Sequence, residues 1–176
     1  MPCYAGPPAA VSFDLVSHPS LGLPPRSLEA GFPEAADRLR AARSRLAVRA
    51  LEAATAADPT MRARFDDTGM RNLLRDAEVF VERLALCVAG NDSHWLSEFA
   101  EQTAIVFRRR KVSLNDVVGV LEGLRRAARG VLSEDEMAPA TAALDAAVAA
   151  TRSHQHLAGD AAKRGRLSSA WYRGPS

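Results

Sequence analysis

Residues 66–91 read DDTGMRNLLRDAEVFVERLALCVAGN, and this stretch decides the fold class of the chain. Its apolar residues recur at three- and four-residue spacing, and they are Met70, Leu73, Leu74, Ala77, Val81, Leu84 and Val88. Charged side chains occupy the opposite face, which is the pattern of an amphipathic α-helix with one buried side. Asp66 offers a capping oxygen at the start, and Gly90-Asn91 suits a left-handed end.

Further stretches on both sides repeat this pattern, and we expect helices over 33–57, 93–111, 113–130 and 138–156. Pro33 fits a first helical turn, and Asp58 before Pro59 leaves the helical region. Ser113 and Ser133 are each followed by an acid three residues on, which predicts reciprocal capping boxes. Pro139 lies too far beyond Ser133 for a smooth first turn, so we expect a short turn before the last helix.

The composition agrees with an all-α chain. Of the 176 residues 47% are hydrophobic and only 6% aromatic, with Ala and Leu providing most of the apolar side chains. We expect a compact five- to six-helix bundle or a globin-like domain over residues 33–157, acting as a sensory or interaction domain. We expect residues 1–32 to form a Pro-rich N-terminal arm or disordered leader, and residues 158–176 to form an irregular, flexible, basic C-terminal tail.

The location of the protein follows from what the sequence lacks. Cys3 and Cys87 are the only cysteines, so no disulfide framework is implied. The first residues lack the basic segment and apolar run of a signal peptide, and no apolar run is long enough to span a bilayer. We therefore expect a soluble, cytoplasmic protein.

The sequence gives little support for catalysis. It shows no nucleophile elbow, no Gly-rich phosphate loop and no useful pairing of a histidine with an acid. The acidic run 134–136 directly follows Ser133, so helix capping explains it better than a metal site. The sequence predicts a non-enzymatic protein with no catalytic residues, no metal ligands and no cofactor.

One histidine nevertheless raises a cofactor-binding alternative. His94 begins a helix beside Trp95 and is a candidate for binding haem or another tetrapyrrole. A partly exposed histidine at a helix start explains the same residues, and we favour that interpretation.

A basic run ends one expected helix at Arg108, Arg109, Arg110 and Lys111. Together with Arg125, Arg126 and Arg129 it makes one basic surface if the two helices fold back on each other. Nucleic-acid binding is one interpretation, and compensation of the helix dipole by solvated side chains is the favoured one. We do not expect nucleic acid to be a partner.

A narrow apolar stripe on the last expected helix indicates self-association. Leu144 and Val148 lie on it and are flanked by many alanines, which suits close contact with a second copy of the same helix. The sequence therefore predicts a homodimer with these two residues in the interface.

Four segments carry a resemblance to a known family: LLRD at 73–76, WLSEFA at 95–100, RRRKVSLND at 108–116 and LEGLRRA at 121–127. The pattern over residues 66–132 resembles the N-terminal sensory domains of RsbR-type stressosome proteins and related bacterial regulators. The resemblance implies a globin-like fold without haem, dimerisation, and a last helix that passes a signal onward. Family members usually continue into an output domain such as a STAS module or a kinase, so a stand-alone form would signal by contact. The family supplies no catalytic residue to carry over.

These observations lead to one functional hypothesis and two alternatives. We expect a non-enzymatic, dimeric sensory or adaptor domain that acts through protein–protein contacts in bacterial signalling and stress response. A haem- or tetrapyrrole-binding globin-like module is the first alternative, and a nucleic-acid-associated protein is the second.

Overall fold

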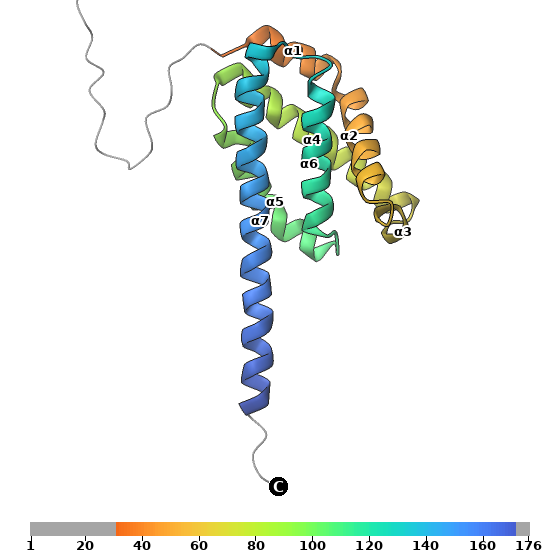
Figure 1. The fold of residues 1–176 in the computed structure, drawn as a ribbon, viewed down its shortest axis with the longest axis vertical. Coiled ribbons are helices and arrows are strands. Elements are labelled where there is room, and N and C mark those ends of the chain that lie inside the picture. The colour runs from red at the N-terminus through yellow and green to blue at the C-terminus, as the bar shows by residue number, and fades with distance from the viewer. Residues whose placement is uncertain (1–30, 172–176) are drawn as a thin grey trace, which may run out of the picture.

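The structure is a computed structural model that describes the backbone of residues 31–171 and the side chains of residues 31–155. The described residues form helices and turns without a strand, so the predicted all-α fold is confirmed. The helices are α1 (Pro33–Ala41), α2 (Arg43–Ala57), α3 (Met61–Arg64), α4 (Asp67–Gly90), α5 (His94–Arg109), α6 (Leu114–Ala128) and α7 (Glu134–Trp171) (Figure 1). Nearly all of the predicted N-terminal arm, residues 1–30, lies outside the described residues.

The single helix expected over residues 33–57 is two helices, α1 and α2, separated at Ala42. The backbone of Ala42 has φ −94° and ψ 5°, and its N–H still donates to the carbonyl of Arg38 at 3.0 Å. Neither glycine nor proline marks this break. It serves tertiary packing, because α1 lies against α4 while α2 lies against both α4 and α6.

Helix α4 lies at the centre of the bundle and contacts α1, α2, α5 and α7. Its fully buried Phe80 packs edge-on against Phe99 of α5, with ring centroids 5.6 Å apart. Phe80 also lies 6.2 Å from the ring of Phe107. Burying one such side chain contributes roughly 1.5–3 kcal/mol, so this aromatic cluster fixes α5 on α4.

Helices α2 and α6 pack closely because small residues face each other across their contact. Gly123 of α6 lies against the backbone of Ala50, and Gly119 lies beside Ala54. The two helices therefore run antiparallel, and side chains at the start of α2 lie toward the C-terminal end of α6.

Helix α7 begins earlier than expected, at Glu134, and it includes Pro139 instead of following it. The capping box is formed: the amide of Ser133 donates to Glu136 at 2.8 Å, and the amide of Glu136 donates to Ser133 Oγ at 3.4 Å. Arg38 of α1 donates to both oxygens of the same Glu136 carboxylate at 2.6 Å. These contacts fix the first turn of α7, and the helix continues through Pro139 in the next turn.

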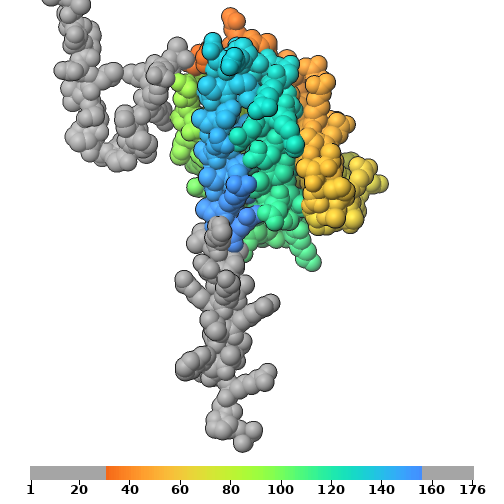
Figure 2. Space-filling model, in the orientation of Figure 1, coloured from red at the N-terminus to blue at the C-terminus, as the bar shows by residue number. Residues whose placement is uncertain are grey.

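The backbone of α7 continues to Trp171, well beyond the other helices (Figure 1). The expected boundary at residue 158 therefore falls inside a helix, and the prediction of an irregular tail is wrong for residues 158–171. The first part of α7 packs against α5 and α6, and the space-filling view shows it beside α6 (Figure 2). No helix within the described residues is both long and apolar enough to cross a membrane.

Candidate functional site

The candidate site surrounds the turn between α5 and α6. Lys111 adopts a left-handed backbone conformation, with φ 59°. The amide of Val112 then donates to the carbonyl of Phe107 at 2.9 Å, and the amide of Lys111 donates to Arg108 at 3.0 Å. These bonds close the end of α5 in the manner of a left-handed helix cap, so the chain reverses within a few residues. Lys111 itself is exposed.

Helix α6 starts with half of the predicted capping box. Ser113 Oγ accepts from the amide of Asn115 at 3.2 Å, which confirms Ser113 as the cap. Asp116 does not return the contact to Ser113. Its carboxylate is instead bound by Arg64 at the end of α3, because a guanidinium is a stronger donor than a neutral amide.

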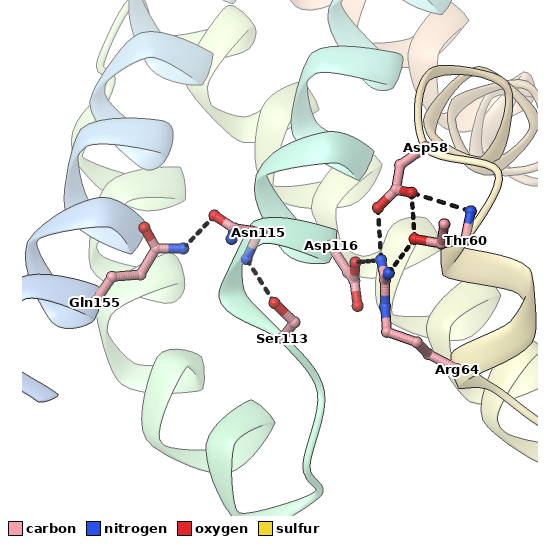
Figure 3. A network of polar contacts seen from close by, with 7 residues as sticks. All are labelled: Asp58, Thr60, Arg64, Ser113, Asn115, Asp116 and Gln155. Carbon is pink, nitrogen blue, oxygen red and sulfur yellow. Dashed lines mark hydrogen bonds and ion pairs between the residues drawn. The ribbon is translucent and has the colours of Figure 1, made fainter. Parts of the chain in front are cut away.

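Asp116 belongs to a polar network that links α3 to α6 (Figure 3). Arg64 donates to Asp116 Oδ1, and it also donates to Asp58 Oδ2 at 2.7 Å and to Thr60 Oγ1 at 2.5 Å. The Asp116 side chain is only 3% exposed, and its Oδ2 atom has no hydrogen-bond partner within the described residues. Burial of a charged group requires such pairing, so Arg64 holds α3 against the start of α6.

Asp58 is the exposed member of the network. Its Oδ1 accepts from the hydroxyl of Thr60 at 2.6 Å and from the amide of Thr60 at 3.0 Å. The hydrogen bond from the Thr60 hydroxyl, followed by the one from Arg64, lowers the pKa of Asp58 from 3.8 to about 2.

The neighbouring residue, Asn115, connects α6 to α7 instead. Gln155 Nε2 donates to Asn115 Oδ1 at 2.9 Å (Figure 3). Asn115 and Asp116 are consecutive in the first turn of α6, yet one is tied to α7 and the other to α3. The start of α6 is therefore the point at which three helices are joined by side-chain contacts.

Two hollows flank the α5–α6 turn. The first, which we name the α5–α6 pocket, has a volume of about 560 Å³ and is lined by Arg108, Lys111, Val112, Ser113, Leu114, Asn115 and Gln155. The second has a volume of about 520 Å³ and lies on the side of α3 and α4, where Arg64, Arg110 and Asp66 are part of its lining. Lys111 and Val112 border both hollows.

The structure separates the members of the predicted basic surface. Arg110 is bound to Asp76 at 2.9 Å and lies over the ring of Phe107, whereas Arg108, Arg109 and Lys111 are exposed. Arg125, Arg126 and Arg129 lie at the other end of α6, roughly 20 Å away at 1.5 Å per residue. Arg125 is paired with Asp145 and Glu122. The two groups therefore do not form one surface.

The structure places His94 and Trp95 on the outside of the bundle. The His94 side chain is 67% exposed, and its Nε2 atom lies 3.4 Å from Glu98. Trp95 is also exposed and borders a shallow hollow with Arg83 and Phe99. A haem ligand requires an apolar pocket between helices, and the position of His94 does not provide one.

The predicted dimer contacts prove to be core residues. Leu144 is fully buried and Val148 is 5% exposed, because the apolar stripe of α7 packs against α5 and α6 of the same chain. Neither side chain is available to a second copy, so the assignment of these two residues to an interface is wrong.

Sequence reasoning missed Arg64, Asn115, Asp116 and Gln155. Asp116 lies at a capping position, and that local explanation concealed its pairing with a residue 52 positions away. The only feature of the sequence that could have indicated this pairing is a cation, Arg64, in the short segment that follows Pro59. No protein-family model matches the chain, and no curated protein matches it.

Proposed function

We propose that the protein is a cytoplasmic, non-enzymatic sensory or adaptor domain that forms a homodimer and acts through protein–protein contacts. The observation that carries this proposal is an exposed apolar surface along α4 and α5. Its residues, which we name the α4–α5 surface, are Val79, Trp95, Ile105 and Val106. Each is between 40% and 49% exposed.

Helix geometry places two of these residues, Trp95 and Val106, on one side of α5. Phe80 packs on Phe99, and Asp76 binds Arg110, so the two helices run antiparallel along their length. Trp95 and Val106 are eleven residues apart, which is close to three full turns and places them on the same face of α5. Grouped exposure of large apolar side chains is typical of protein-binding surfaces, whereas single exposed residues are ordinary.

Helix α7 connects the bundle to residues beyond it, so a contact on the bundle can affect a more distant part of the chain. Its first part is fixed by Glu136 at one end and Gln155 at the other, and its backbone then continues to Trp171. The resemblance to sensory domains of RsbR-type bacterial regulators supports the same role. The haem-free, globin-like arrangement and the link to stress signalling belong to this proposal.

Light scattering coupled to size-exclusion chromatography tests the proposal. The wild-type protein should elute as a dimer, and Val106→Glu should convert it to a folded monomer because a charge then occupies the interface. Val48→Glu is the matched control, since Val48 of α2 is also exposed, at 42%. A wild-type monomer at 100 μM, or a dimer that survives Val106→Glu, would contradict the proposal.

A further inference from the structure

We propose that the α5–α6 pocket binds the phosphate group of a small soluble ligand. This inference rests on the sensory function proposed above and names the class of ligand that would be sensed. Two cations, Arg108 and Lys111, line the pocket, and none of the described residues that line it is acidic. A hollow with uncompensated positive charge attracts an anion.

Part of the positive charge of the bundle is compensated by carboxylates. Five arginines are each bound to a carboxylate in the described residues, namely Arg38, Arg40, Arg64, Arg110 and Arg125. No such partner is found there for Arg108 or Lys111, although Asp116 lies only a few residues along the chain. The carboxylate of Asp116 is buried against Arg64, and Asp116 is not part of the pocket lining.

The other residues of the pocket suit a phosphate-bearing molecule better than a simple ion. A guanidinium matches the oxygens of a phosphate in pairs, and an ammonium adds a compact charge. Asn115 and Gln155 add amide groups, and the hydroxyl of Ser113 also borders the hollow. Val112 and Leu114, both largely buried, give the pocket an apolar part on which an uncharged portion of the ligand can lie.

The pocket is built from three helices, and this gives ligand binding a structural consequence. Arg108 belongs to α5, Asn115 to α6 and Gln155 to α7. A phosphate held between them adds contacts beside the hydrogen bond that joins Gln155 to Asn115. Binding therefore strengthens the attachment of α7 at the position where it leaves the bundle.

Isothermal titration with inorganic pyrophosphate at constant ionic strength tests the site. We expect saturable binding that weakens at least tenfold in the double variant Arg108→Gln/Lys111→Gln. The control is Arg43→Gln/Arg45→Gln, which removes the same charge from exposed positions at the start of α2 and should change affinity less than twofold. Absence of saturable binding, or equal loss in both variants, would overturn the proposal, since the latter indicates general charge attraction.

Three additional measurements sharpen the result. Gln155→Glu preserves the shape of the side chain but places a negative charge in the pocket, so it should weaken pyrophosphate binding at least tenfold. Hydrogen exchange at residues 150–155 should slow on saturation with pyrophosphate, and unchanged exchange would contradict the coupling to α7. Sedimentation with phosphatidic acid vesicles in the absence of pyrophosphate binding would assign the cations to a lipid surface and overturn the soluble ligand.

The outcome is separable from the test of dimerisation. The α4–α5 surface contains none of the pocket residues, so the Arg108→Gln/Lys111→Gln variant should retain the oligomeric state of the wild type. A dimer without pyrophosphate binding would refute the pocket alone, and a pyrophosphate-binding monomer would refute the dimer alone.

Discussion

Gly123 of α6 lies so close to Ala50 of α2 that a Cβ atom at position 123 would be 2.2 Å from the carbonyl oxygen of Ala50. No side chain fits at that distance without moving one helix from the other. The contact between α2 and α6 therefore requires glycine at this position, although glycine is a poor helix former.

Gly123→Ala should destabilise the fold by about 1–3 kcal/mol, because the added methyl group forces α2 and α6 apart. Gly119→Ala provides the control on the same helix. A Cβ there would lie 3.6 Å from the Cβ of Ala54, an ordinary contact, so the better helix propensity of alanine should leave stability unchanged or raised. Urea unfolding followed by circular dichroism measures both, and equal effects of the two substitutions would contradict the packing argument.

Asp116→Asn should lower the free energy of unfolding by about 1–3 kcal/mol, since it removes the charge that pairs with Arg64 inside the bundle. Asp58→Asn removes the second carboxylate from the same guanidinium at a site where the side chain is 47% exposed, and its effect should be the smaller of the two. Chemical denaturation of both variants tests this order. A larger loss in Asp58→Asn would show that Asp116 is not the anchor of α3.

Glu136→Ala should destabilise the protein more than Arg38→Ala does. The first change removes both the capping contact to Ser133 and the ion pair with Arg38. The second removes only the ion pair, whose Arg38 side is 46% exposed, and should cost less. Thermal unfolding of the two variants and of Ser133→Ala compares these contributions, and equal losses for Glu136→Ala and Arg38→Ala would exclude the capping role.

The pKa of Asp58 should be near 2 in the folded protein, against an ordinary value of 3.8. A lowered carboxyl pKa stabilises the fold above pH 4, and this stabilisation disappears as the pH falls from about 4 to about 2. Thr60→Val should raise the pKa, because the hydroxyl that donates to Asp58 is lost. NMR titration of the Asp58 carboxyl carbon measures the value, and an unchanged pKa in Thr60→Val would show that Arg64 alone sets it.

Burial raises the pKa of the Cys87 thiol to about 11, from an ordinary value near 9.0. A raised thiol pKa means that this group stabilises the fold below pH 9 and ceases to do so as the pH rises from about 9 to about 11. In a Cys3→Ser background, Cys87 should react with a disulfide reagent at pH 8 only as fast as the protein opens. Rapid reaction of the native protein would contradict the burial of this residue.

The helical pattern of the chain was predictable because it depends on local spacing. The stripe from Met70 to Val88 appears as α4, with Asp66 as its cap and Asn91 in the left-handed conformation at its end. Pro59 correctly marked the end of α2. These features depend on residues within a few positions of one another, so they can be predicted from the sequence alone.

The predictions that proved wrong concern features that depend on residues far apart in the sequence. The break at Ala42 has no local cause and arises from the different neighbours of α1 and α2. Leu144 and Val148 were assigned to a dimer because an apolar stripe does not reveal which surface covers it. Asp116 satisfied a capping pattern, yet its actual partner is Arg64. In each case the choice between partners is made by tertiary packing.

The length of α7 beyond the bundle turns it into a lever. Residues 156–171 extend about 24 Å at 1.5 Å per residue, so a tilt of about 10° in the packed part displaces the far end by about 4 Å. A tilt of the packed part is thereby passed to the far end of α7 as a displacement of similar size. Transmission of this kind needs only a helix that moves as one body, and the hydrogen bond between Gln155 and Asn115 lies where α7 leaves the bundle.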